Sequence, residues 1–214
     1  MRQTSIGFVS KSLTLEGVLT TPVDTVGPHH GLVVCHPHPV LGGNMDHPVI
    51  TTICKIADMH GIATLRFNFR GVGSSEGLFS NGSSEKEDAK SALNVLRSWP
   101  NINSKKVAVA GYSFGASVLL DGVSHYKAAR SLVLISPPVS AVERSRIRKD
   151  KRPKIFLSGQ KDKLSPSIDL QRLLDDFPTS VHFREIPNAD HTMRGHEVEL
   201  AELVIDFVSS TMKT

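Results

Sequence analysis

The stretch VAVAGYSFGASVLL, residues 107–120, constrains the fold more than any other part of the chain. Its first residues form a short apolar run that predicts a buried strand, and residues 116–120 are apolar with helical spacing. Between them lies Ser113, with Gly111 and Gly115 two positions away on either side. A strand that turns directly into a helix strains the residue at the corner and exposes its side chain. The residues two positions away are pressed against a neighbouring strand and helix, so we expect glycine where a Cβ would clash.

Strands and helices alternate on both sides of this corner. Residues 4–20 have the pattern of two antiparallel strands at the edge of a sheet. Further strands are expected at 31–36, 63–69, 107–111, 131–136, 154–159 and 181–186. Helices are expected at 46–60, 84–99, 114–125, 166–176 and 197–212, and Ser84 with Glu87 forms a capping-box signature. This order predicts right-handed crossovers and a mostly parallel sheet with helices on both faces, so the loops after the strands should converge at one edge.

Ser113 is the candidate nucleophile, and it needs a base because a serine hydroxyl reacts poorly at neutral pH. His191 is the candidate base, since it lies in the loop PNADHTMRG between the last strand and the last helix. His196 is the alternative. The other histidines considered lie in a polar linker, at helix ends or inside a strand: His29, His30, His60, His125 and His182.

A third group must orient the base. Asp162 is the candidate because it stands in LSGQKDKLSP, directly after a predicted strand, where a carboxylate can face the imidazole across one loop. Asp190 is the alternative, although it adjoins His191 and would have to bend back to reach the far nitrogen of that ring.

Acyl transfer also requires hydrogen-bond donors for the developing oxyanion. The amide of Phe114, directly after the candidate nucleophile, is the first candidate. The second should come from the loop HPHPVLGG, in which Pro37 and Pro39 carry no amide hydrogen. We therefore favour the backbone of His38, with residues 40–42 as further candidates.

Two glycine- or histidine-rich loops invite other interpretations. His36 and His38 could suggest zinc, but they bracket a proline and no other ligand set accompanies them. We expect no metal there, and we expect His36 to pack beneath the loop and hold its backbone. RGVGSSEG, residues 70–77, lacks the glycine spacing of a dinucleotide site and any GK[ST], so no cofactor is expected. It is interpreted as a tight loop that shapes one wall of the cleft and holds Arg70 in a salt bridge.

The formal net charge of +4 is concentrated in one segment, ERSRIRKDKRPK, from Glu143 to Lys154. Single-strand nucleic-acid surfaces combine basic with aromatic side chains, yet aromatics make up 6% of the chain and none lies in this segment. We interpret the segment as a solvated surface loop, with attraction of acidic substrates or partners as the alternative. An interaction module for nucleic acid at residues 144–154 is not expected.

Length and composition are those of one globular domain spanning residues 1–214. No apolar run approaches the roughly 18 residues of a membrane span, and MRQTSIGFVSKS lacks the apolar core of a signal peptide. We expect a soluble, cytoplasmic protein without a membrane partner, either a monomer or a homodimer. Cys35 and Cys54 form neither a CxxC nor a disulfide framework, and Cys35 ends the apolar run GLVVC, so a buried, reduced thiol is expected there.

Five segments together resemble the signatures of a known group: VCHPHPVLGGNMDHPVI, LRFNFRGVGSSEG, AGYSFGASV, LSGQKD and NADHTMRG. The chain resembles, from about residue 5 to residue 210, the small lidless serine hydrolases of the α/β-hydrolase superfamily that are related to dienelactone hydrolases and X-Pro dipeptidyl-peptidases. The resemblance implies an α/β-hydrolase fold, an esterase-type activity and a catalytic triad of Ser113, Asp162 and His191. Dienelactone hydrolases proper share a cysteine nucleophile at this position. The serine at position 113 therefore argues against dienelactone hydrolase activity.

The segment 137–153 is too short for a substantial lid, which lidded relatives insert at this point. The prediction is therefore a carboxylesterase with an open cleft that cleaves small acyl esters through an acyl-enzyme on Ser113. Thioesterase or peptidase chemistry at the same residues remains open, since the basic segment could favour an anionic leaving portion such as coenzyme A. A catalytically silent binding protein on a hydrolase scaffold is the alternative from another class.

Overall fold

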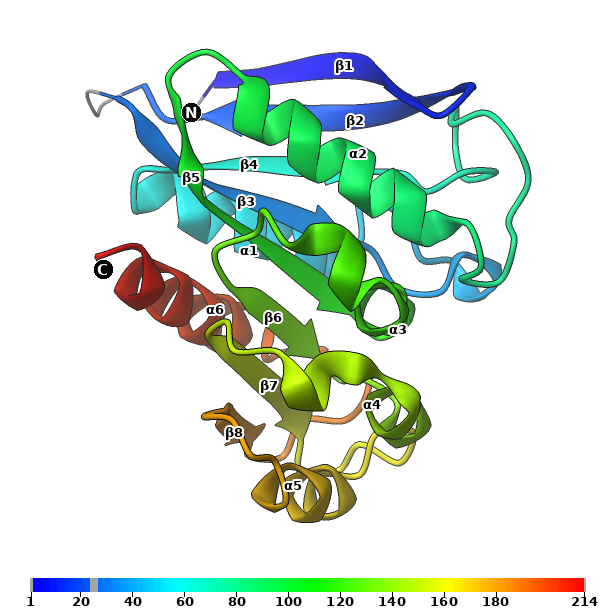
Figure 1. Ribbon diagram of the computed structural model, residues 1–214, viewed down its shortest axis with the longest axis vertical. Helices are drawn as coiled ribbons and strands as arrows, with labels where there is room; N and C mark the ends of the chain where they lie inside the picture. The colour runs from blue at the N-terminus through cyan, green and yellow to red at the C-terminus, as the bar shows by residue number, and fades with distance from the viewer. Residues whose placement is uncertain (1, 24–26, 214) are drawn as a thin grey trace.

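The computed structural model describes residues 2–23 and 27–213. Their strands form an eight-stranded sheet in the order β1-β2-β4-β3-β5-β6-β7-β8 (Figure 1). The strands are β1 Arg2–Ser10, β2 Leu13–Thr21, β3 His29–Cys35, β4 Ile62–Phe67, β5 Ile102–Tyr112, β6 Leu132–Ile135, β7 Lys154–Gly159 and β8 His182–Ile186. The helices are α1 Pro48–Met59, α2 Glu85–Ser98, α3 Phe114–Asp121, α4 Val139–Arg144, α5 Ser167–Asp175 and α6 Glu197–Met212, with short 3₁₀ turns at Pro39–Leu41, Val123–Tyr126 and Arg146–Lys149.

The sheet is antiparallel at its amino-terminal edge and parallel elsewhere. β1 pairs with β2, and β2 pairs with β4, both antiparallel. Every other neighbouring pair, from β4–β3 to β7–β8, is parallel. This is the mostly parallel sheet with an antiparallel edge hairpin that the order of elements predicts, and it agrees with the α/β-hydrolase fold that the resemblance implies.

Helices cover both faces of the sheet, because the central strands are apolar on both sides. In β3, Val33 and Cys35 join the core cluster shared with α2, α3, α4 and α5. Leu32 and Val34 face the other way and join the cluster shared with α1 and α6. The carboxyl ends of the parallel strands therefore meet at one edge between two helical layers (Figure 1).

Several predicted boundaries were wrong. The predicted helix 114–125 ends at Asp121, and Gly122 leads into the 3₁₀ turn Val123–Tyr126. A Cβ on Gly122 would lie 2.3 Å from the buried Tyr126 hydroxyl, so the close approach of that ring requires glycine. β5 begins at Ile102, five residues before the predicted strand, because β3 extends far enough to pair with it.

The basic segment, residues 143–154, lies at the surface as predicted, but it is not a loop throughout. It includes the end of α4 and the turn Arg146–Lys149, in which Ile147 is buried while Arg146, Arg148 and Lys149 are exposed. Within the same segment, Arg152 forms a salt bridge with Asp150, with Nη2 2.7 Å from Oδ2. Cys35 is free and buried, as predicted, and Cys54 is free and buried as well. No helix in the described part of the chain is long and apolar enough to cross a bilayer.

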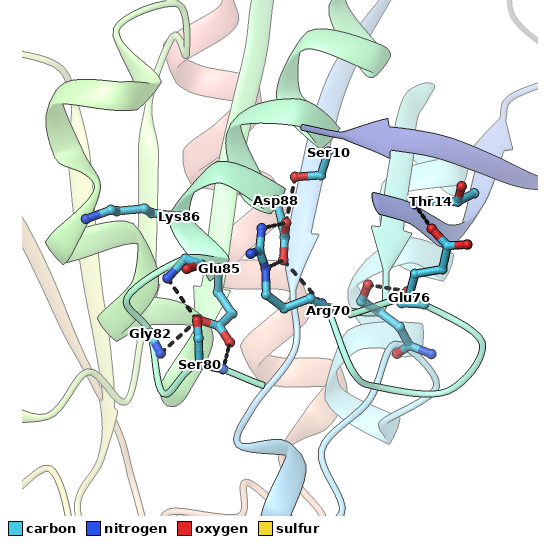
Figure 2. A network of polar contacts seen from close by, with 12 residues as sticks. Ser10, Thr14, Arg70, Glu76, Ser80, Gly82, Glu85, Lys86 and Asp88 are labelled. Carbon is cyan, nitrogen blue, oxygen red and sulfur yellow. Dashed lines mark hydrogen bonds and ion pairs between the residues drawn. The ribbon is translucent and has the colours of Figure 1, made fainter. Parts of the chain in front are cut away.

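Carboxylates at the start of α2 hold the loop after β4, as Figure 2 shows. Asp88 accepts hydrogen bonds from Ser10 Oγ at 2.6 Å and from Arg70 Nη2 at 2.6 Å, which confirms the predicted salt bridge of Arg70. Glu85 accepts from the Ser80 amide at 2.7 Å and the Gly82 amide at 2.9 Å. The predicted capping box was wrong, because the side chain of the N-cap residue makes no capping bond and Glu85 organises the helix start instead.

Candidate active site

The corner between β5 and α3 has the strained geometry that its sequence predicts. Ser113 has φ 53° and ψ −108°, and its amide donates to Ile135 O in β6 at 2.8 Å. A Cβ on Gly115 would lie 2.4 Å from Cys35 O, and a Cβ on Gly111 would lie 2.5 Å from the backbone of Gly115. Both approaches are closer than any side chain tolerates, so the prediction about the two glycines is confirmed.

Three polar side chains from distant loops meet at this corner. Ser113 Oγ lies 2.8 Å from His191 Nε2, and His191 Nδ1 lies 2.8 Å from Asp162 Oδ2. The Asp162 side chain is fully buried, whereas that of His191 is 21% exposed. The structure therefore places an imidazole within hydrogen-bond reach of the serine hydroxyl and a carboxylate against the other ring nitrogen, which is the arrangement that an activated serine nucleophile requires.

Hydrogen bonds within the loop after β7 fix the position of the Asp162 side chain. Asp162 Oδ1 accepts hydrogen bonds from the amides of Leu164 at 2.9 Å and Ser165 at 2.8 Å. Ser165 Oγ donates to Pro137 O at 2.6 Å, and Ser158 Oγ donates to Ser165 O at 2.7 Å. Because these amides fix the carboxylate, both of its oxygens face His191 Nδ1, Oδ2 at 2.8 Å and Oδ1 at 3.0 Å.

The alternative residues are engaged elsewhere. Asp190 accepts from the amide and the hydroxyl of Thr192, at 2.8 and 2.6 Å, so it closes a turn beside the histidine rather than facing its ring. These two bonds are the main cause of the lowered pKa of Asp190. His196 Nδ1 lies 3.3 Å from Glu199 on the exposed start of α6.

Tyr112 supports the histidine loop, and the sequence reasoning did not identify it. Its hydroxyl donates to His191 O at 2.5 Å, and burial is the main cause of its raised pKa. The one sequence signal was its place immediately before the candidate nucleophile, at the end of a strand.

The loop HPHPVLGG, residues 36–43, follows β3 and contains His36 and His38, which make different contacts. His38 O accepts from the amides of Leu41 and Gly43, at 3.1 and 3.0 Å. Phe114 begins α3, where the first amides have no partner within the helix. The His38 ring packs edge-on against Phe114, with centroids 5.1 Å apart, so the two predicted amide donors belong to adjoining segments.

His36 lies beneath this loop, as predicted. Its Nδ1 lies 2.6 Å from Pro37 O, and its Nε2 accepts from the Phe69 amide at 3.2 Å. Both ring nitrogens are therefore used in binding backbone, and burial lowers the pKa of His36 to about 4. Among the residues that the structure describes, no group of three His, Cys, Asp or Glu side chains could hold a metal ion.

Ser113 and His191 open onto a cavity of about 260 Å³. Its walls are mainly apolar, and Leu41 and Leu164 at its mouth are 82% and 66% exposed. The prediction that residues 70–77 form a wall was wrong, because none of them lines this cavity and Val72 and Gly73 line a separate hollow next to Pro39 and Gly42. Arg144 and Arg146 of the basic segment line another hollow, next to Asp121.

Comparisons with known proteins agree with the fold. A family model described as an alpha/beta hydrolase domain matches residues 32–203. An uncharacterized protein of Rickettsia prowazekii is 32% identical over 184 residues, which cover 82% of this chain and 77% of that protein.

Solved structures show the same likeness. An alpha-beta serine hydrolase homologue from Coxiella burnetii is 30% identical, with 96% of this chain and 97% of that chain covered and a TM-score of 0.84. A serine hydrolase without a lid from Xanthomonas campestris is 23% identical, with 100% and 97% covered and a TM-score of 0.86, which speaks for the fold alone.

Proposed function

The chain belongs to the alpha/beta hydrolase family, and from this premise we propose that it is a serine carboxylesterase acting on small acyl esters. The observation that carries the proposal is the continuous hydrogen-bonded line from Ser113 Oγ through His191 to Asp162, with both steps at 2.8 Å. Such a line can generate an alkoxide-like nucleophile at neutral pH.

In the proposed mechanism, Ser113 Oγ attacks the ester carbonyl while His191 Nε2 accepts its proton. The buried carboxylate of Asp162 stabilises the imidazolium that forms, and the amides of Phe114 and His38 bind the oxyanion. His191 then returns the proton to the departing alcohol, which leaves an acyl group on Ser113. Water, activated by the same histidine, releases the acid and restores the free enzyme.

The cavity supports the choice of small substrates. Its volume of about 260 Å³ lies just below the usual range for ligand pockets, which begins at roughly 300 Å³. The exposed leucines at its mouth favour short apolar acyl or alkyl groups over long chains, which would extend into solvent.

Thioesterase and peptidase chemistry use the same three residues, but no specific contact favours them. The argument for a coenzyme A portion depended on the basic segment lying beside the cleft. Arg144 and Arg146 instead border a different hollow, and Arg144 is paired with Asp121 at 3.1 Å. We therefore propose the ester as the substrate class.

The test is turnover of a panel of p-nitrophenyl and alkyl esters, with Ser113→Ala as the blank, alongside labelling by a fluorophosphonate. We expect a covalent adduct on wild-type protein, ester hydrolysis at least a thousandfold above Ser113→Ala, and weaker activity on acyl-coenzyme A and aminoacyl amides. Absence of both adduct and turnover would favour a silent binding protein on a hydrolase scaffold. Faster cleavage of the thioester or amide would reassign the substrate class.

A further inference from the structure

Besides His191, the imidazoles of His38 and His47 line the cavity onto which Ser113 opens, and His47 is the candidate for substrate binding. His47 is the residue that caps the start of α1, and its Nδ1 accepts a hydrogen bond from the Val49 amide at 3.3 Å. Its ring is half-buried and lies edge-on to the ring of Tyr112, with centroids 5.5 Å apart. Its position is therefore set from two sides, by the helix start and by the tyrosine before the nucleophile.

The capping bond decides where the proton of this imidazole lies. A neutral imidazole has one donor and one acceptor nitrogen, and Nδ1 is the acceptor here, so Nε2 carries the hydrogen. Burial lowers the pKa of His47, and the opposing field of Glu197 is the smaller influence. The ring is consequently a neutral donor at neutral pH, with its Nε2–H on the side away from the helix.

Two other polar groups around the cavity have intramolecular partners. The Tyr112 hydroxyl donates to His191 O at 2.5 Å, and the Thr192 hydroxyl donates to Asp190 at 2.6 Å. The half-buried His38 ring packs against two aromatic rings, with centroids 5.3 Å from Phe79 and 5.1 Å from Phe114, and its Nδ1 accepts from the Val40 amide at 3.3 Å. His47 Nε2 has no hydrogen-bond partner among the described residues, so a substrate atom can satisfy it.

The charge around the cavity limits what that substrate atom can be. No lysine or arginine is among the described residues that line it, while the buried carboxylate of Asp162 lies behind His191. A carboxylate or phosphate on the substrate would lose its hydration without meeting a cation. An uncharged oxygen, such as an ether, hydroxyl or ketone oxygen, accepts from a neutral imidazole without that penalty.

We propose that His47 determines substrate specificity, and that its Nε2–H binds an uncharged oxygen of the substrate other than the ester carbonyl. The inference rests on the proposed esterase function and narrows its substrate class to short esters that carry a second, neutral hydrogen-bond acceptor.

Two substitutions of His47 separate its role as the N-cap of α1 from its role as a hydrogen-bond donor to the substrate. His47→Asn retains a side-chain acceptor close to the backbone, and asparagine is a good N-cap, but its side chain is too short to replace the Nε2 donor. His47→Gln extends an amide NH₂ to about the position of the imidazole Nε2, but it lacks the acceptor at the capping position. A purely structural role for His47 would harm the glutamine variant more, whereas a role in recognition would harm the asparagine variant more.

The experiment measures kcat/KM on matched ester pairs that differ by one oxygen for one methylene. p-Nitrophenyl methoxyacetate against p-nitrophenyl butyrate places the oxygen on the acyl side, and 2-methoxyethyl butyrate against n-butyl butyrate places it on the alcohol side. The readout is the ratio within a pair, compared between wild type and variants, because intrinsic ester reactivity then cancels. Melting temperatures report the effect on the helix cap.

We expect the preference for the oxygenated ester in at least one pair to fall about tenfold in His47→Asn and to recover in His47→Gln. Equal ratios in wild type and His47→Asn for both pairs, with an active wild type, would overturn this inference and leave the esterase proposal intact. A wild type that hydrolyses no ester and takes no fluorophosphonate label would overturn both.

Discussion

Two buried carboxylates at the same edge of the sheet, Asp88 and Asp162, are held in opposite ways. Asp88 is matched by a permanent cation, since Arg70 binds it through Nη2 at 2.6 Å and Nε at 2.9 Å. Asp162 is held by two backbone amides and faces an imidazole, His191, at 2.8 Å. Both side chains are fully buried, so burial alone does not distinguish them.

The difference lies in where the negative charge is compensated. The charge of Asp88 is neutralised within the fold, and that pair serves to hold the loop after β4 against β1 and α2 (Figure 2). The charge of Asp162 is only partly compensated by amides, so it remains available to a positive charge that develops on His191. A carboxylate paired with arginine is thus suited to structure, and a carboxylate paired with histidine is suited to proton transfer.

Asp162→Asn should have the largest effect, and on activity. The amide preserves the shape but offers no negative charge and orients the imidazole wrongly, so we expect kcat on a small ester to fall by on the order of 10⁴-fold. The free energy of unfolding, measured by urea titration, should change by less than about 2 kcal/mol. A loss of activity below tenfold would mean that Asp162 does not support His191 in the reaction.

Asp88→Asn should show the reverse pattern. The substitution removes the carboxylate that pairs directly with the guanidinium of Arg70, itself only 12% exposed, and we expect the free energy of unfolding to decrease by about 3–5 kcal/mol. Activity per folded molecule at low temperature should remain within about threefold of wild type, because Asp88 does not border the cavity. The comparison between the two carboxylates fails if the variant is as stable as wild type.

The pH dependence of stability should report on His36, which lies between the two regions. Its pKa is about 4 in the folded protein and about 6.5 in an unfolded chain, so the unfolded state binds more protons between these values. Stability contributed by the neutral ring is complete above pH 6.5 and is lost as the pH falls towards 4, by about 3 kcal/mol.

The measurement is urea unfolding at pH 7 and at pH 4.5 for wild type and His36→Gln. Other groups titrate in this range and contribute equally to both proteins. The change in unfolding free energy between pH 7 and pH 4.5, compared between wild type and His36→Gln, therefore isolates the contribution of the imidazole. The same change in both proteins would show that His36 is not held neutral by burial.

Tyr112→Phe should have the smallest effect. It removes the hydroxyl that donates to His191 O at 2.5 Å but leaves the buried ring in place. We expect a three- to tenfold decrease in kcat and a loss of about 1 kcal/mol in stability, because one buried carbonyl of the histidine loop loses its partner. An unchanged kcat would show that the loop keeps its position without this bond.

Much of the fold followed from local patterns in the chain. The corner at Ser113 was predictable because its two glycines are required by close contacts, of Gly111 with the backbone of Gly115 and of Gly115 with Cys35 in the neighbouring strand. The mostly parallel sheet with an antiparallel edge followed from the alternation of elements, whereas the order of its strands comes from the structure. Ser113, Asp162 and His191 lie in loops that every parallel sheet brings to one edge, and their close contact is observed, while their catalytic roles remain predictions.

The cavity itself was decided by tertiary structure. Residues 70–77 looked like a cleft wall, but the Arg70–Asp88 pair draws them towards β1 and α2, so the hollow they line is a different one. His47, the capping residue of α1, lines the cavity because α1 begins beside Tyr112. Strand periodicity and corner glycines depend on neighbouring residues and can be read along the chain, whereas the lining of a cavity depends on side chains from distant segments whose approach is set by packing.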